Sequence, residues 1–129
     1  MIKYEFNQAQ LDSLMSISEE DGPDLVRQLF DMFQETMPGA ISKVTKAVEV
    51  KDWASLSAEA HRLKSTCGNL GIHSMSMIAK ALEDAGRSQG ANISAEDLNL
   101  LTILFNSQLT SAIEDLKKYI SLMELKKGK

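Results

Sequence analysis

Hydrophobic residues recur every three to four positions along most of this 129-residue chain. That spacing places side chains on one face of an α-helix. Strand patterns are nearly absent, and the one clear alternation of apolar and polar residues is the short segment with Ile2, Tyr4 and Phe6. The pattern therefore predicts an all-α protein.

The first predicted helix is short. It begins after Asn7 and ends at the polar stretch 18–21. Its apolar face carries Leu11, Leu14 and Met15. We expect this helix to be an accessory element beside the main fold.

The second predicted helix has strong start signals. Asp21 can cap it, and Pro23 costs little in a first turn because the missing N–H has no helical partner there. The spacing predicts a buried stripe made of Leu25, Leu29, Phe33 and Met37.

Pro38 and Gly39 should kink or interrupt this helix. The apolar face nevertheless resumes at the same period, so we expect one long bent helix that reaches about Val50. Two helices separated by a break are the alternative. The residues of the resumed face are Ile41, Val44, Ala47 and Val48.

Two further helices follow after short loops. Asp52 can cap a third helix over residues 53–70, and Gly71 is its stop signal because glycine readily adopts a left-handed conformation. Ser74 can cap a fourth helix that ends near residues 86–90. Its predicted buried face consists of Met75, Ile78, Ala79 and Leu82.

The last predicted helix is long and amphipathic. Ser94 followed by Asp97 resembles a capping box. Its apolar positions are Leu98, Leu101, Phe105, Leu109, Ala112, Leu116, Ile120 and Met123. Four substantial helices with short loops predict an antiparallel four-helix bundle over residues 21–126, in a single domain of residues 1–129 with an N-terminal accessory segment 1–20.

Composition narrows the classes of function. A formal net charge of −4 and the lack of a long basic run disfavour nucleic-acid binding. The N-terminus lacks the apolar run of a signal peptide, and no apolar stretch is long enough to cross a bilayer. Cys67 is the only cysteine, which excludes an intrachain disulfide and a two-cysteine metal site. We expect a cytoplasmic protein without a membrane partner.

The third helix has two unlike faces. At about 100° of rotation per residue, a group of mostly small residues lies within about 60° of His61, and an apolar group lies opposite. The first group is Ala54, Ser57, Ala58, Lys64, Ser65 and Gly68, and the second is Leu56, Leu63, Cys67 and Leu70. We therefore expect His61 to face away from the core, on a surface that leaves room for another molecule.

This face suggests an anionic ligand. Lys64 lies one turn from His61, which suits a phosphoryl group and does not suit a bound cation. Gly68 costs about 1 kcal/mol relative to alanine in a helix, a cost that close approach by another surface would explain. The alternatives are a surface histidine without function and a metal site with His73 or Cys67, which is disfavoured because Cys67 should face the core. The carboxylates all occupy positions expected on solvated helix faces.

These residues resemble the histidine-containing phosphotransfer domain family. Its signature is roughly His, any residue, Leu, Lys, Gly, small residues and a closing Leu-Gly pair, matched here by His61, Leu63, Lys64, the small residues 65–67 and the pair 70–71. The stretches 25–44, 47–64 and 75–87 resemble the helices around the family's site, so most of residues 11–90 is covered. One departure is Ser65, where the family usually has glycine.

The resemblance implies a phosphorelay intermediate in two-component signal transduction. His61 would accept a phosphoryl group from a phospho-aspartate of a receiver domain, through Nε2, and pass it to another receiver. Lys64 would offset the phosphoryl charge. By geometry, the docking face would include Ala54, Ser57, Ala58, Ser65 and Gly68.

The implied partners are response-regulator receiver domains and a (hybrid) sensor histidine kinase. The receiver would bring Mg²⁺, and this chain would bind no cofactor or metal. The chain has no nucleotide-binding glycine loop and no kinase segment, so we expect a carrier and not an enzyme. We also expect a monomeric, free-standing shuttle. The alternative function is a non-transferring helical module that binds and regulates a receiver or kinase.

Overall fold

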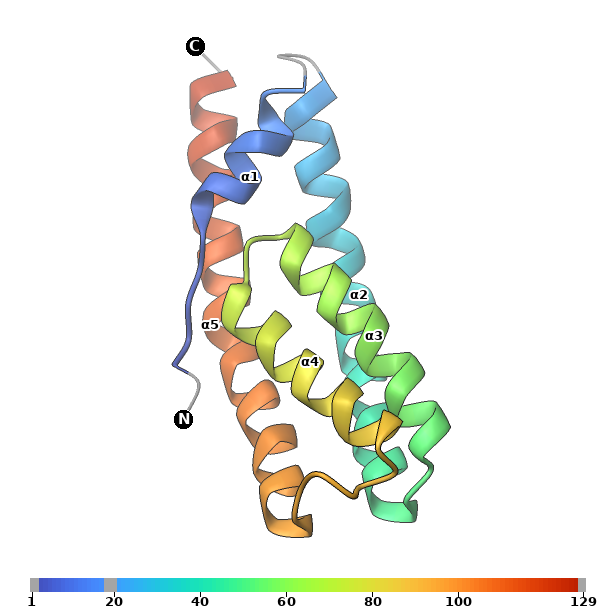
Figure 1. The fold of residues 1–129 in the computed structure, drawn as a ribbon. Coiled ribbons are helices and arrows are strands. Elements are labelled where there is room, and N and C mark those ends of the chain that lie inside the picture. The colour runs from blue at the N-terminus through green and yellow to red at the C-terminus, as the bar shows by residue number, and fades with distance from the viewer. Residues whose placement is uncertain (1–2, 18–20, 128–129) are drawn as a thin grey trace.

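The apolar periodicity of the sequence produces five helices in the computed structural model, which describes residues 3–17 and 21–127 (Figure 1). They are α1 (Gln8–Met15), α2 (Asp21–Val50), α3 (Trp53–Asn69), α4 (His73–Arg87) and α5 (Ala95–Lys127). No strand is present in these described ranges. The all-α prediction is therefore confirmed.

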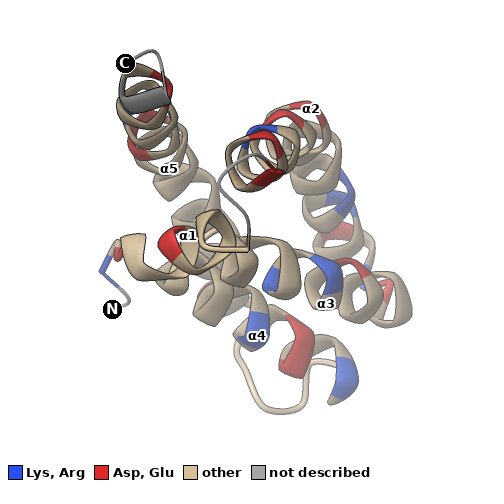
Figure 2. Cartoon of the chain, turned by 90° about the horizontal axis from the view of Figure 1, so that it is seen from above, with Lys and Arg blue, Asp and Glu red and all other residues tan. Residues whose placement is uncertain are grey.

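The two longest helices, α2 and α5, run the length of the molecule (Figure 1). The helices α3 and α4 form a hairpin that packs against one half of this pair, which completes the four-helix bundle. The short α1 lies across the other half, beside the ends of α2 and α5 (Figures 1 and 2). This arrangement agrees with the predicted bundle and accessory helix.

Three of the predicted helix starts are confirmed by their hydrogen bonds. The side chains of Asn7 and Asp52 accept hydrogen bonds from the N–H groups of Ala9 and Ser55, and Ser94 Oγ accepts one from Asp97 N–H at 3.1 Å. These bonds satisfy N–H groups that have no partner inside the helix.

The prediction that Ser74 caps α4 is wrong. The helix begins at His73 and has no side-chain cap. Ser74 is buried, where its Oγ accepts a hydrogen bond from Glu5 N–H at 2.7 Å and donates one to Gln108 at 2.8 Å. Its hydroxyl thus ties the N-terminal segment to α5, a role that depends on parts of the chain far away in sequence.

The start of α2 also differs slightly from the prediction. Asp21 lies in the first turn of the helix and not at the position before it. The residues directly before Asp21, residues 18–20, lie outside the described ranges. Acidic Asp21 and Asp24 in the first turn complement the positive end of the helix dipole.

Helix α2 continues through Pro38, so the alternative of two helices with a break is wrong. Its buried stripe is also rotated from the predicted one, because Leu25 and Leu29 are only half-buried while Phe33 and Met37 are buried as expected. The apolar face of α2 is wider than the core, and packing against the neighbouring helices decides which edge is covered. The buried positions are Gly22, Val26, Phe30, Phe33, Met37, Ala40, Val44 and Ala47.

The N-terminal segment and α1 are fixed to the bundle by side-chain and backbone bonds. Tyr4 donates to Asp115 at 2.6 Å, and Tyr119 donates to Asp12 at 2.8 Å. Asn7 N–H donates to the carbonyl of Gly71 at 2.6 Å, which connects the segment to the turn between α3 and α4. The accessory segment therefore braces the hairpin that carries His61.

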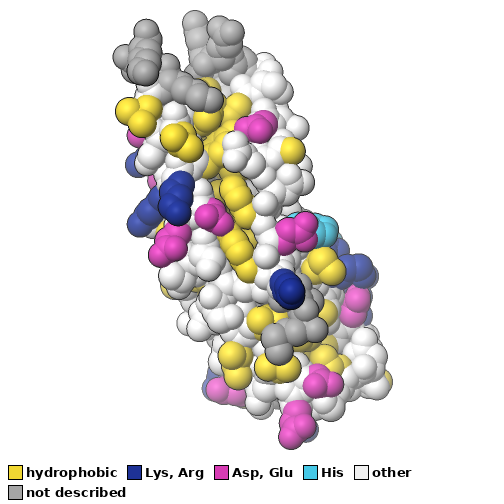
Figure 3. Space-filling model, turned by 90° about the vertical axis from the view of Figure 1, so that its left-hand side faces the viewer, with side chains coloured by type: hydrophobic (Ala, Val, Ile, Leu, Met, Phe, Trp, Pro, Cys, Tyr) yellow, Lys and Arg dark blue, Asp and Glu magenta, His cyan; other side chains and the backbone are white. Residues whose placement is uncertain are grey.

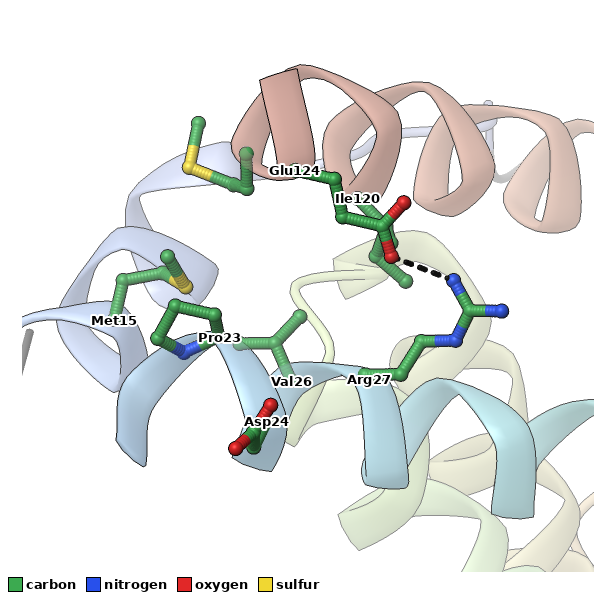
Figure 4. Close-up of a pocket in the computed structure, with 8 residues that line it drawn as sticks. Met15, Pro23, Asp24, Val26, Arg27, Ile120 and Glu124 are labelled. Carbon is green, nitrogen blue, oxygen red and sulfur yellow. Dashed lines mark hydrogen bonds and ion pairs between the residues drawn. The ribbon is translucent and has the colours of Figure 1, made fainter. Parts of the chain in front are cut away.

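A small cavity of about 100 Å³ lies where α1, α2 and α5 meet (Figure 4). Met15, Val26 and Ile120 contribute apolar walls, and an ion pair between Arg27 and Glu124, 3.0 Å long, lies at its edge.

Hydrophobic side chains also remain visible on the outer surface (Figure 3). Within the described ranges, no helix has the length and apolar character needed to cross a membrane.

Candidate functional site

His61 lies on the outer side of α3, and its side chain is 58% exposed. The opposite side of the helix is buried at Leu56, Leu63, Cys67 and Leu70. The predictions that His61 faces away from the core and that the opposite side of the helix is buried are therefore confirmed.

A buried carboxylate from α4 lies beside the histidine. Glu83 is only 3% exposed, and its Oε2 lies 2.6 Å from His61 Nδ1. An ionised carboxylate can only accept hydrogen bonds, so the proton of a neutral His61 ring belongs on Nδ1. Nε2 is then left with a free lone pair.

Two cations compensate the charge of Glu83. Lys64 Nζ lies 2.8 Å from Oε1, and Arg87 Nη2 lies 3.1 Å from Oε2. The hydrogen bond from Lys64 is the largest of the effects that hold the pKa of Glu83 below its ordinary value, and the bond from His61 and the charge of Arg87 act in the same direction. Burial raises the pKa of Glu83, but its effect is smaller than the combined lowering by these partners. Glu83 is therefore ionised at neutral pH.

Close packing of α3 on α4 brings these four side chains together. The backbone of Gly86 approaches Ser57 so closely that an added Cβ would lie 2.7 Å from Ser57 N and 2.9 Å from Trp53 O. Ser76 Oγ also donates to the carbonyl of Lys64 at 2.8 Å. Glycine at position 86 thus permits the helix spacing at which Glu83 reaches His61.

Gly71 shapes the turn between the two helices. Its φ of +79° lies in the left-handed region, and an added Cβ would collide with the carbonyl oxygen of Asn7. Only glycine fits there without strain. The turn reverses the chain so that residues 22 positions apart, His61 and Glu83, become neighbours.

The residues predicted for the docking face do not all have the same exposure. Ala54, Ala58 and Ser65 are exposed, whereas Ser57 and Gly68 are half-buried at the side where α4 packs. An added Cβ at Gly68 would meet Ser76 Oγ at 3.5 Å, an ordinary contact. The packing of α3 on α4 therefore does not itself require glycine at position 68, and the role of this face in docking stays a prediction.

The prediction that every carboxylate lies on a solvated helix face is wrong for Glu83, which is buried. The signal was present in the spacing. Glu83 follows the buried Ala79 by four positions and directly follows the buried Leu82, so it lies inside the apolar face of α4. A charged residue at such a position is rarely fully buried unless it is paired.

Cys67 takes no part in this site. It is fully buried, and burial raises the pKa of its thiol to about 12. A protonated, inaccessible thiol is a poor nucleophile. Among the described residues, no group of three or more His, Cys, Asp and Glu side chains is arranged to hold a metal ion.

Comparison with known protein families gives a match for this chain. The model of the Hpt domain matches residues 28–119. No curated protein sequence shows a significant match to the chain.

Three solved structures share the fold. Histidine-containing phosphotransfer protein B from Pseudomonas aeruginosa PAO1 is similar with a TM-score of 0.72 at 18% identity, over 90% of this chain and 94% of that chain. The histidine-containing phosphotransfer domain of ArcB from Escherichia coli gives 0.65 at 19% identity, over 91% and 93%. The corresponding domain of a sensor hybrid histidine kinase from Shewanella gives 0.67 at 18% identity, over 91% and 94%.

Proposed function

Because this chain belongs to the Hpt domain family and so has a histidine phosphotransfer role in two-component phosphorelays, we propose that His61 is the residue that carries the phosphoryl group. The single observation that carries this proposal is the bond of 2.6 Å between His61 Nδ1 and buried Glu83. It leaves Nε2 as the nucleophilic nitrogen of an exposed ring. The chain has one other histidine, His73, for which no such partner is found in the described residues.

The transfer step follows from this tautomer. The lone pair of Nε2 attacks the phosphorus of a receiver's phospho-aspartate, and an N–P bond forms. The P–O bond to the aspartyl carboxylate breaks, and its electron pair leaves with that carboxylate. The Nδ1 proton stays on the ring, which becomes positively charged, and Glu83 accepts its hydrogen bond and stabilises that charge. Transfer to a second receiver is the reverse of this step.

Lys64 is proposed to neutralise part of the phosphoryl charge. Its side chain is one helical turn from His61 and 32% exposed, so its ammonium group can reach a group on the outer nitrogen. Most of the catalysis of phosphoryl transfer is positioning and charge stabilisation, so a nucleophile and a cation are a sufficient contribution from this side. We expect the receiver to supply Mg²⁺ and its own acidic residues.

The proposed docking surface is the exposed side of α3 around His61. In-line attack requires a whole receiver domain to reach Nε2, and small residues such as Ala54, Ala58 and Ser65 leave room for it. Ser65, where the family usually has glycine, adds only a small exposed side chain. The partners proposed on this basis are receiver domains and a sensor histidine kinase.

The experiment that tests this function mixes the purified chain with a phosphorylated receiver and Mg²⁺. We expect intact mass spectrometry to detect one acid-labile phosphoryl group on the parent protein and none on His61→Gln. The matched control is His73→Gln, which removes the other histidine and should accept phosphate normally. Phosphate on the His61→Gln protein would contradict the proposal.

A non-transferring interaction module is the second candidate function. It would bind a receiver without accepting phosphate. The same experiment separates the two, because binding to a receiver with no transfer across a broad panel of receivers would favour the module. The buried Glu83 beside His61 argues against it, since a binding surface has no need of an imidazole held in one tautomer.

A further inference from the structure

We propose that Arg87 is a positioning residue for the phosphorylated state, which holds Glu83 in place when Lys64 turns to the phosphoryl group. This inference rests on the proposed role of His61. Arg87 touches neither the imidazole nor the reacting atoms in the described contacts, and it acts through the carboxylate of Glu83.

The two oxygens of Glu83 have different partners. Oε2 is shared by His61 Nδ1 and Arg87 Nη2, at 2.6 and 3.1 Å. Oε1 lies 2.8 Å from Lys64 Nζ. Arg87 can therefore keep its contact with Glu83 while Lys64 leaves, because the two cations bind different oxygens.

Once His61 is phosphorylated, Lys64 can interact with two anions, the carboxylate of Glu83 and the phosphoryl group. Its ammonium group is bound to Glu83 in the resting protein, yet the side chain is also one helical turn from His61 and 32% exposed. Glu83 is only 3% exposed, so water cannot replace the hydrogen bond from Lys64 if that side chain moves away. A buried carboxylate that loses its partner is strongly destabilised, so a second cation is needed for Lys64 to move.

The formal charges of the site support this role. In the resting site, Lys64 and Arg87 outweigh Glu83 by one positive charge. Transfer adds a phosphoryl group with about two negative charges and one positive charge on the ring, so the phosphorylated site becomes about neutral. Without Arg87, the same site would be neutral at rest and negative after transfer. Arg87 thus supplies the positive charge that makes the phosphorylated site about neutral.

The test uses phosphoramidate, a small phosphoryl donor, so that no receiver takes part. All proteins carry His73→Gln, which leaves His61 as the only histidine of the chain. We compare the steady-state ratio of phosphorylated to unphosphorylated His61 in the parent, Arg87→Gln and Arg87→Lys proteins. Phosphohistidine is quantified by intact mass, and circular dichroism verifies the helical fold of each variant.

The matched control is Lys80→Gln. Lys80 lies on the same helix, is 63% exposed where Arg87 is 65% exposed, and also forms an i,i+4 pair, but with Asp84. We expect Arg87→Gln to lower the ratio about two- to fivefold, Arg87→Lys to restore most of it, and Lys80→Gln to leave it unchanged. The deficit should shrink as salt is added, because the lost interaction is electrostatic and partly exposed.

An Arg87→Gln protein with the parental ratio would overturn the inference, as would an equal deficit in Lys80→Gln. A deficit that appears only with a phosphorylated receiver would assign Arg87 to docking instead, which also overturns it. Failure of the receiver to phosphorylate His61 would count against the proposed function alone. The phosphoramidate reaction probes the local charges whether or not a receiver is present.

Discussion

His61 and Glu83 show how a single buried side chain sets the chemistry of an exposed one. The histidine alone could carry its proton on either ring nitrogen. The carboxylate at 2.6 Å selects Nδ1 for that proton, and Lys64 and Arg87 keep the carboxylate ionised. The four residues therefore form one electrostatic network, and replacing one of them should change the charge or hydrogen bonding of the others.

Replacing Glu83 with glutamine tests this unit through its effect on stability. The folded-state pKa of Glu83 lies below its ordinary value of 4.5, so its ion pairs stabilise the fold fully above pH 4.5 and are lost as the pH falls through the folded-state pKa. We expect Glu83→Gln to lower the free energy of unfolding by about 1 to 3 kcal/mol at neutral pH.

Urea unfolding at neutral pH and at a pH below the folded-state pKa of Glu83 measures this effect. The difference between the parent and Glu83→Gln should narrow at the acidic pH, where Glu83 is protonated in both the folded and the unfolded parent. A gap of the same size at both pH values would mean that charge pairing is not the source of the stabilisation.

At the scale of the elements, the α3–α4 hairpin is the frame of the site. Its two helices pack tightly at Gly86, close to Glu83 and Arg87 in sequence, and their turn is held by Asn7 through Gly71. The distance between His61 and Glu83 depends on this helix spacing. A small separation of the helices would therefore break the bond that sets the tautomer.

Gly86→Ala should force such a separation, since its Cβ would lie 2.7 Å from backbone nitrogen of Ser57. We expect a loss of about 1 to 3 kcal/mol in the free energy of unfolding, together with slower phosphoryl transfer to His61. Urea unfolding and a transfer assay on the same sample measure both.

Gly39→Ala is the matched control for this prediction. It lies within α2, and an added Cβ there has no neighbour within 4 Å. This change should stabilise the protein by up to about 1 kcal/mol, because alanine favours helix over glycine. Equal destabilisation of both variants would show that the spacing of α3 and α4 is not what Gly86 provides.

At the scale of the whole molecule, the accessory helix completes the core where the four-helix bundle is incomplete. Helix α1 contributes Leu11, which is fully buried, and Tyr119 and Asp12 tie it to α5. The covered ends of α2 and α5 would otherwise expose apolar surface. We therefore regard α1 as part of one cooperative unit with the site.

Leu11→Ala tests this unity. Removing a fully buried leucine side chain should cost about 2 to 4 kcal/mol of unfolding free energy and leave a single transition, monitored by helical circular dichroism in urea. Ile17→Ala, at a position that is 66% exposed, should change the stability by less than about 0.5 kcal/mol. A separate early transition for Leu11→Ala would show that α1 unfolds independently of the bundle.

Much of the fold was determined by local information in the sequence. Periodicity, the side-chain caps Asn7, Asp52 and Ser94, and the stop at Gly71 are signals within a few residues of the structure they produce. The two faces of α3 follow from the same periodicity. These predictions held because helix starts, stops and faces depend on neighbours along the chain.

The tertiary structure alone decided which residues meet across the helices. It turned α2 so that Val26 and Phe30 are buried where Leu25 and Leu29 were predicted, and it used Ser74 to bind the N-terminal segment where a cap was expected. It also brought Glu83 to His61 across 22 positions. Periodicity places a residue on a face but does not say which residue of another helix lies opposite, because helix rotation and spacing are set by packing of the whole core.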